Sequence, residues 1–260
     1  MTGKTKSSIW LITIFSLLLS ACSREVLRGN ESSLVAEKVT IGNQAIIYPD
    51  APPSVPDGEV VWHKLNCATC HGITGQGGAG KCTLNLTDKN YMNRQKPADQ
   101  YRFLAFGRAG MSHPAISQLV SRREAWNLVF YVRSLARPPM TNAKYMEVDP
   151  VFGSNCAVCH GKKGYGDGPL SHNLEPVPAN FQNFERFYDR SDSLLWDHIA
   201  NGIKWEGMPN FLGKEDKAKN VKFDQAYIWQ LVDYVRHFQE TTEKMAPSDT
   251  KAVKGKNLST

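Results

Sequence analysis

Six cysteines are the residues of this chain with the most distinctive chemistry, and four of them form two copies of one motif. The first copy is Cys67-Ala-Thr-Cys70-His71 and the second is Cys156-Ala-Val-Cys159-His160. A thioredoxin-like redox pair and half of a zinc site also contain Cys-x-x-Cys. Neither interpretation explains why a histidine follows each second cysteine. Zinc would also require two distant cysteine pairs to converge.

Cys-x-x-Cys-His is the attachment motif of c-type haem. The two thiols bond to the two vinyl groups of the porphyrin, and the adjacent imidazole reaches the iron from one side. A glycine follows each motif, at Gly72 and Gly161. We therefore expect two covalently bound haem c groups, whose predicted binding residues are Cys67, Cys70, His71, Cys156, Cys159 and His160.

The elements that must position these motifs also occur twice. A glycine-rich loop follows each motif, and a short helix is predicted after each loop. In the first half, Pro97 suits the first turn of this helix and Gly107 its C-terminal cap. In the second half, Ser191 suits the N-cap and Gly202 the C-terminal cap.

A methionine and an amphipathic helix complete each half. Met111 and Met208 each follow a glycine. Ser121 and Glu124 predict a capping box at the start of the first final helix, and Asp224 predicts the N-cap of the second. Apolar residues recur at helical spacing in both helices. Each half is thus predicted to contain, in order, a helix, the motif, a glycine-rich loop, a helix, a methionine and a helix.

That order resembles the class I cytochrome c fold, over residues 57–138 and 150–240. The resemblance implies an all-α chain of two tandem domains, each wrapped around a covalently bound haem. In that family a methionine sulfur is the second axial ligand of the iron. The iron ligands that the resemblance implies are His71, Met111, His160 and Met208.

The first half departs from the family pattern at two places. The family usually has a proline about a dozen residues after the haem histidine, and its carbonyl accepts the imidazole N–H. Pro176 and Pro178 are the candidates in the second half, whereas the first half has Cys82 and Thr83 there. Cys82 could be a buried packing residue, form an intermolecular disulfide or have a redox role.

The second departure is Met111-Ser112-His113-Pro114, where the family more often has Met-Pro. His113 could replace Met111 on the iron, and the choice matters because a thioether ligand raises the haem potential. We predict Met111, because it follows a glycine at the place expected before the last helix. The remaining histidines lack a partner at ligand spacing and are predicted to be surface or packing residues: His63, His172, His198 and His237.

The N-terminus carries an export signal. Lys4 and Lys6 precede an apolar run over residues 9–19, which is followed by Leu19-Ser20-Ala21-Cys22. These are the parts of a secretory signal peptide, and the run is shorter than the roughly 20 residues of a membrane-spanning helix. The ending resembles a bacterial lipobox, which implies acylation of Cys22. The alternative is an ordinary signal peptide cleaved near Ala21.

These features predict the domain organisation. The predicted segments are a signal peptide (1–21), a lipidated N-terminus and tether (22–56), a first cytochrome domain (57–138), a linker (139–149), a second cytochrome domain (150–240) and a disordered tail (241–260). The tether is proline-rich near its end, and the tail is rich in lysine, serine and threonine without aromatic residues.

Electron transfer is the function that these predictions favour. A net charge of +6 with interspersed acids and bases does not indicate a nucleic-acid-binding protein. An iron with histidine and methionine ligands has no open position, so one-electron transfer remains. We predict a carrier between redox partner proteins, or the cytochrome subunit of a respiratory complex, held by lipid in the cell envelope facing the periplasm or exterior. The alternative is a dihaem oxidoreductase, resembling thiosulfate dehydrogenases or peroxidases, with one accessible haem.

Overall fold

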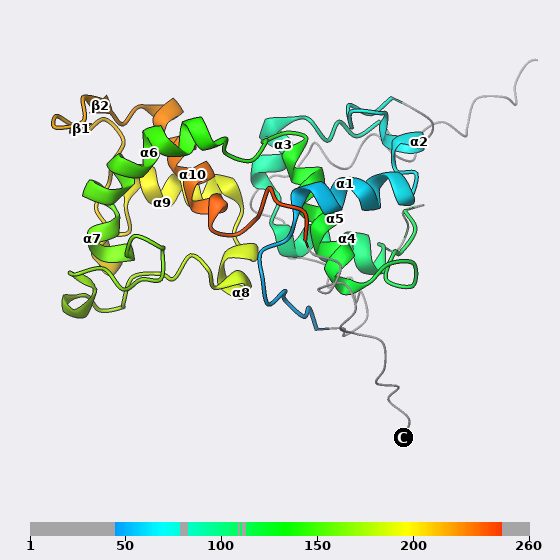
Figure 1. Cartoon of the computed structure of the whole chain (residues 1–260), viewed down its shortest axis with the longest axis horizontal. Helices are drawn as coiled ribbons and strands as arrows, with labels where there is room; N and C mark the ends of the chain where they lie inside the picture. The colour runs from blue at the N-terminus through cyan, green and yellow to red at the C-terminus, as the bar shows by residue number, and fades with distance from the viewer. Residues whose placement is uncertain (1–44, 79–82, 109, 111–112, 246–260) are drawn as a thin grey trace, which may run out of the picture. The chain divides into compact units, whose positions relative to one another are not determined.

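The computed structural model describes residues 45–78, 83–108, 110 and 113–245. The chain divides into two units, residues 1–39 and 40–260, and every described residue belongs to the second. The described part is predominantly helical, which confirms the all-α prediction (Figure 1). None of the helices in these ranges is long and apolar enough to cross a membrane.

The first half consists of five helices packed around the crossing of the first and the last. They are α1 (Val55–Lys64), α2 (Ala68–His71), α3 (Lys89–Arg94), α4 (Pro97–Phe106) and α5 (Arg122–Ser134). Helices α1 and α5 lie side by side and make the most extensive contact between elements (Figure 1). The helices touch at Gly58, where a Cβ atom would lie 2.0 Å from the carbonyl oxygen of Asn127. The absence of a side chain at Gly58 is therefore what allows this close crossing.

The second half repeats this order with additional short elements. They are α6 (Asn142–Asn155), α7 (Ala157–His160), η1 (Ser171–Asn173), α8 (Phe184–Tyr188), α9 (Asp192–Asn201), η2 (Lys204–Glu206), β1 (Glu215–Asp216), β2 (Val221–Lys222) and α10 (Gln225–His237). Strands β1 and β2 form an antiparallel pair in which Glu215 lies opposite Lys222. This hairpin precedes α10 and is an addition to the helical scaffold.

The helix boundaries predicted from local capping signals are confirmed. Pro97 lies in the first turn of α4, and Ser191 caps α9 by accepting a hydrogen bond from the Leu194 amide. Ser121 and Glu124 form both halves of a capping box at α5. Helices α4 and α9 have ten residues each, and α5 and α10 have thirteen each. These later helices therefore match in length as well as in order, whereas α1 has ten residues and α6 has fourteen.

Two apolar clusters form the core, one in each half, and the first receives side chains from the second half. Trp62 and Trp126 are fully buried in the first cluster, and Tyr234 in the second. Tyr188 of α8 belongs to the first cluster, where its ring centroid lies 5.0 Å from that of Trp126 and 4.9 Å from that of Phe130. The two halves thus share packing and are more than domains joined by a linker.

The predicted boundaries of tether, linker and tail differ from the structure. Helix α6 begins at Asn142, inside the predicted linker, and α1 begins at Val55, inside the predicted tether. Thr241 lies in the predicted disordered tail, but its amide donates to the Pro53 carbonyl at 2.8 Å and it forms a parallel bridge with Ser54. Backbone pairing between distant segments holds these residues, and local composition does not reveal such pairing.

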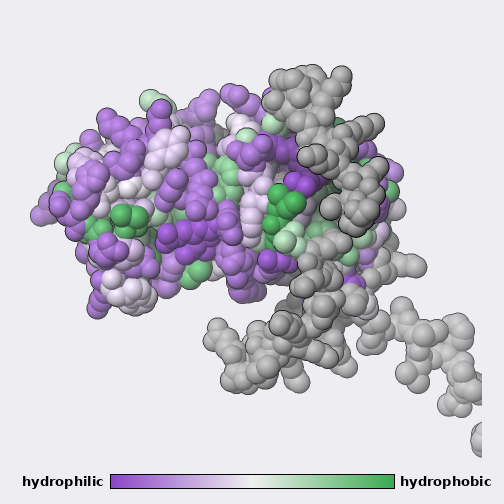
Figure 2. Space-filling view, turned by 90° about the horizontal axis from the view of Figure 1, so that it is seen from below, coloured by the Kyte–Doolittle hydropathy of each residue, from purple (hydrophilic) through white to green (hydrophobic). Residues whose placement is uncertain are grey.

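The described surface is mainly polar. On the face shown in Figure 2, hydrophilic residues predominate and hydrophobic residues form small separate groups. Among the large hydrophobic side chains, Trp205 and Ile73 are the most exposed, at 83% and 81%. Ile73 lies two residues after His71, and Trp205 lies three residues before Met208, so both are close in sequence to predicted iron ligands.

Candidate haem sites

Each Cys-x-x-Cys-His motif forms one helical turn, α2 in the first half and α7 in the second. The His71 amide donates to the Cys67 carbonyl at 3.0 Å, and the His160 amide donates to the Cys156 carbonyl at 2.9 Å. Gly72 ends α2 with a φ of 81°, a conformation that favours glycine. Each turn therefore holds two thiols and one imidazole in a short, defined segment.

In the second half, a backbone carbonyl fixes the proton on the histidine ring. Nδ1 of His160 lies 3.1 Å from the carbonyl oxygen of Ala179. A carbonyl only accepts, so Nδ1 donates this hydrogen bond and Nε2 is left free to bind a metal. The ring also stacks on Phe181, with centroids 4.5 Å apart.

The acceptor is a correction to the sequence analysis, which offered Pro176 and Pro178. The carbonyl of Pro178 instead lies against Gly166, where a Cβ atom would be 2.3 Å from its oxygen. The Phe181 amide donates to the Gly164 carbonyl at 2.6 Å and docks the following segment. The loop therefore presents the carbonyl of Ala179, one residue beyond the predicted proline, to His160.

In the first half the corresponding nitrogen has no partner among the described residues. Nδ1 of His71 and Nε1 of Trp62 are both buried without a hydrogen-bond partner in the described structure. Their rings lie 5.9 Å apart. Buried polar atoms are normally satisfied. The carbonyl expected to accept from His71 belongs to the loop near Cys82 and Thr83, and residues 79–82 of that loop lie outside the described part of the chain.

Burial sets the protonation of the motif residues. It raises the pKa of the Cys67 thiol to about 11 and that of the Cys156 thiol to about 12. Burial also lowers the pKa of His160, and burial together with nearby His113 lowers the pKa of His71. Neutral imidazole is the form that binds metals. The uncharged, partly buried thiols and imidazoles thus fit an apolar metalloporphyrin.

Of the remaining predicted ligand and modification residues, only Met208 lies within the described structure. Met208 is partly buried against the second core, and its amide donates to the Ile203 carbonyl at 3.1 Å. Met111, Cys82 and Cys22 lie outside the described residues. Within the described ranges, no group of three or more His, Cys, Asp or Glu side chains is placed to hold a bare metal ion. Convergence of the two cysteine pairs on zinc therefore has no support there.

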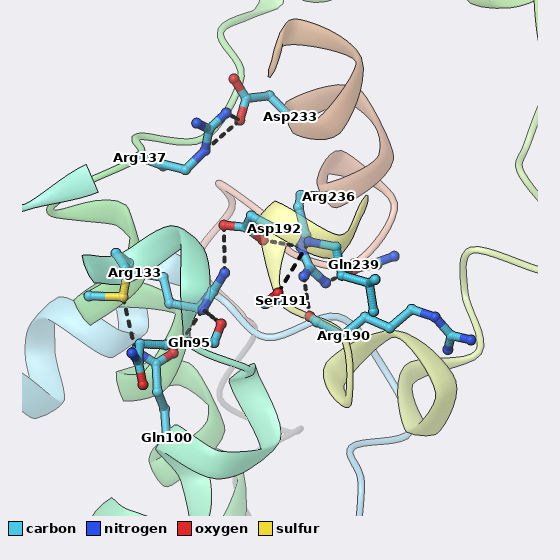
Figure 3. A network of polar contacts seen from close by, with 12 residues as sticks. Gln95, Gln100, Arg133, Arg137, Arg190, Ser191, Asp192, Asp233, Arg236 and Gln239 are labelled. Atoms are coloured by element: carbon cyan, nitrogen blue, oxygen red, sulfur yellow. Dashed lines mark hydrogen bonds and ion pairs between the residues drawn. The ribbon is translucent and has the colours of Figure 1, made fainter. Parts of the chain in front are cut away.

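A buried charge cluster joins the two halves and was not predicted from the sequence. Arg133 of α5 donates to one carboxylate oxygen of Asp192 at 2.7 Å, and Arg236 of α10 donates to the other at 2.8 Å (Figure 3). All three side chains are at most 7% exposed. Asp192 is the first residue of α9, so one carboxylate connects the final helices of both halves.

Backbone and amide groups complete the coordination of both guanidinium groups. Arg133 also donates to the Gln95 carbonyl at 3.0 Å and to the Gln100 side chain at 2.9 Å. Arg236 donates to the Arg190 carbonyl at 2.7 Å (Figure 3). This satisfaction is what makes a buried ionic cluster tolerable, because a charge buried without partners is strongly destabilising.

Electrostatics keep the central carboxylate ionised. Burial raises the pKa of Asp192, but the two arginines outweigh burial and hold the pKa below its ordinary value. For nearby Glu240, burial outweighs the same two arginines and raises the pKa to about 8. The sequence did contain a signal for the arginines, because Tyr-Val-Arg occurs at the same place in both final helices, ending at Arg133 and Arg236.

Comparisons with known families match both halves. Residues 53–132 match the family described as cytochrome c oxidase, cbb3-type, subunit III. Residues 147–239 match the family described as cytochrome c. The chain therefore contains two cytochrome c domains, which confirms the resemblance found in the sequence. Two such domains imply two covalently bound haem c groups, as predicted.

Several curated relatives are cbb3-type oxidase subunits. The chain is 30% identical over 112 residues to the cbb3-type cytochrome c oxidase subunit FixP of Sinorhizobium medicae, covering 40% of this chain and 38% of the relative. It is 34% identical over 119 residues to FixP of Azorhizobium caulinodans, covering 42% and 40%. It is 28% identical over 184 residues to subunit CcoP of Azospirillum brasilense, covering 66% and 58%. The matched part thus spans roughly two fifths to three fifths of these relatives.

Proposed function

We propose that this protein transfers single electrons between redox partner proteins through two haem groups. The observation that carries this proposal is the occurrence of two cytochrome c domains in one chain, each with a complete Cys-x-x-Cys-His turn. When bound, haem supplies a metal centre that changes its oxidation state by one electron. No other constellation of residues is required of the chain for this function.

The roles of the chain's residues follow from their chemistry. The covalent attachment points are Cys67, Cys70, Cys156 and Cys159. His71 and His160 supply an imidazole to each iron, and Met208 supplies a thioether in the second domain. The Ala179 carbonyl orients His160 by holding the proton on Nδ1. The sequence prediction for the second axial ligand in the first domain is Met111, which lies outside the described residues.

The partner and the anchor extend this proposal. Because the FixP and CcoP relatives are subunits of cbb3-type oxidases, we propose that the chain acts as the cytochrome subunit of a respiratory complex or as a tethered carrier serving one. The Leu-Ser-Ala-Cys sequence supports acylation at Cys22, which would hold the protein at a membrane in the cell envelope. The haem domains would then face the periplasm or exterior.

Haem content and partner recovery test the function together. The full chain is produced in a bacterium that attaches c-type haem, extracted in detergent and purified by an affinity tag. We expect two haems per chain and rapid reduction and reoxidation by small one-electron reagents. If oxidase subunits are purified together with the chain, the chain is a subunit of the complex. If the chain is purified without them, the tethered carrier is supported. Fewer than two haems, or haems that do not exchange electrons, would contradict the proposal.

Cys22→Ser tests the anchor separately. The substitution removes the acylated thiol, so we expect loss of fatty-acid labelling and release of the protein from membranes. Cys82→Ser is the matched control, because it also removes one thiol outside the two haem motifs and should keep the label. Undiminished labelling of the Cys22→Ser variant would contradict lipidation at this residue.

A further inference from the structure

The loop after α4 and the loop after α9 correspond residue for residue. Gly107 ends α4 and Gly202 ends α9. Farther along, the Ile116 amide donates to the Leu104 carbonyl at 3.0 Å, and its counterpart, the Phe211 amide, donates to the Ile199 carbonyl at 3.2 Å. Gly107 and Gly202 are 95 positions apart, as are Ile116 and Phe211. The segment from the glycine to the residue that donates this hydrogen bond therefore has the same length in both domains.

This correspondence places His113 opposite Met208. Both residues lie six positions after the glycine that ends the preceding helix, and a proline follows each, Pro114 or Pro209. The carbonyl oxygen of Met208 lies against Gly202, where a Cβ atom would be 2.6 Å away. The carbonyl oxygen of His113 lies against Gly107 in the same way, at 3.4 Å. Met111 is two positions too early to be the counterpart of Met208.

The ring of His113 also lies near that of the haem histidine. The ring centroids of His71 and His113 are 6.3 Å apart. A bond between a metal and an imidazole nitrogen is about 2.0 Å, and that nitrogen lies roughly 1.2 Å from the ring centre. Two imidazoles on opposite sides of one iron therefore have ring centres roughly 6 to 6.5 Å apart. The observed separation fits this arrangement.

The local contacts of His113 leave the correct nitrogen available. Nδ1 lies 3.1 Å from the carbonyl oxygen of Pro114, so Nδ1 donates and Nε2 is unprotonated. Phe103 of α4 packs against the ring, with centroids 4.6 Å apart. The ring is thus held by its own loop and by α4, as expected of a ligand whose second nitrogen is fixed by a hydrogen bond.

We infer that His113, rather than Met111, is the second axial ligand of the first haem. The first domain is then a bis-histidine centre and the second a histidine–methionine centre. This inference rests on the proposed function, since it assumes that both domains carry haem. Methionine ligation raises a haem potential relative to bis-histidine ligation, so the first haem has the lower potential.

Absorption of the oxidised holoprotein tests the inference. The weak long-wavelength band that arises from sulfur bonded to ferric iron is quantified per haem in the full chain and in single variants. We expect intensity for one haem in the unaltered protein. Met208→Leu should abolish the band, and Met111→Leu should leave it unchanged. Met146→Leu, at a 70% exposed position of α6, controls for methionine replacement in general.

The reciprocal variant adds a gain of signal. His113→Met should double the band and raise the potential of the first haem, because it places a thioether at the position that corresponds to Met208. Band intensity for two haems in the unaltered protein, halved by Met111→Leu, would overturn the inference and leave the electron-transfer function standing. A chain with fewer than two haems would count against the proposed function instead.

Discussion

The first and second cytochrome domains share a scaffold and differ where the haem histidine meets its surroundings. Helices α4 and α9 have ten residues each and α5 and α10 thirteen each, and the loops that follow α4 and α9 form corresponding backbone hydrogen bonds. Yet Nδ1 of His160 donates to the Ala179 carbonyl, whereas Nδ1 of His71 is buried without a partner in the described structure.

The residue at the loop position of Met208 differs as well, because His113 occupies the equivalent position in the first domain. Helix lengths and caps are set by packing and backbone hydrogen bonding, which both domains need equally. Axial ligands set the reduction potential, so different ligands would give the two haems different potentials. On the inferred assignment, the two domains keep the same later helices and differ in the ligands of their irons.

Removing one pair of haem thiols has the largest expected effect on this comparison. A variant with Cys67→Ala and Cys70→Ala should lose the first haem, and one with Cys156→Ala and Cys159→Ala the second, because each haem is held by its own two thioethers. Alkaline pyridine spectra should show half the haem content in each case. The remaining spectrum then belongs to one domain. Loss of both haems from either variant would contradict independent attachment.

Asp192 tests whether the domains depend on each other. Asp192→Asn leaves Arg133 and Arg236 buried without their carboxylate, which we expect to lower the free energy of unfolding by about 3 to 5 kcal/mol. Asp189→Asn is the control, because this exposed residue forms an ion pair with Lys96 at 3.5 Å and its loss should cost less than about 1 kcal/mol. Denaturant unfolding of the holoproteins gives both values. Equal values would show that the cluster does not join the domains energetically.

The carboxylate of Asp192 also makes the stability of the folded protein depend on pH. Its pKa is lower in the folded protein than the roughly 3.9 of an unfolded chain, because the two arginines outweigh burial. The stability it contributes is therefore present above about pH 4 and is lost as the pH falls further. Unfolding below pH 4 should be steeper in the unaltered protein than in Asp192→Asn. If the free energy of unfolding fell equally steeply below pH 4 in both proteins, Asp192 would not be the cause of the acid sensitivity.

A pair of glycines compares the first helices of the two domains. Gly58→Ala places a Cβ atom against the Asn127 carbonyl at the crossing of α1 and α5, and we expect a loss of about 1 to 3 kcal/mol. Gly153→Ala in α6 is the control, because a Cβ atom there meets nothing within 4 Å. It should stabilise the helix by up to about 1 kcal/mol. Thermal unfolding checks both variants: the melting temperature should fall for Gly58→Ala and rise for Gly153→Ala.

Local signals in the sequence predicted much of the scaffold. The caps at Ser121, Ser191 and Asp224 were correct because a cap depends on a few neighbouring residues. Contacts between distant segments were missed. The pairing of Thr241 with Pro53 and the placement of Tyr188 in the first core depend on long-range packing, which has no local signature.

The ligand predicted for the first domain depends on which pair of glycines is aligned. Aligning the glycine before Met111 with the glycine before Met208 favours a methionine ligand. Counting six residues from the glycine that ends each preceding helix selects His113 instead, and the docking hydrogen bonds support that count. The second count was available in the sequence, but only the structure shows that both loops dock at matching points.

A potentiometric titration of the full holoprotein, followed by its visible spectrum, tests the central claim most directly. Two haems with unequal axial ligands should titrate as two separate one-electron steps. The step at lower potential should disappear in the variant with Cys67→Ala and Cys70→Ala. Two haems of indistinguishable potential, or loss of the higher step from that variant, would contradict the assignment of a bis-histidine first domain and a histidine–methionine second domain.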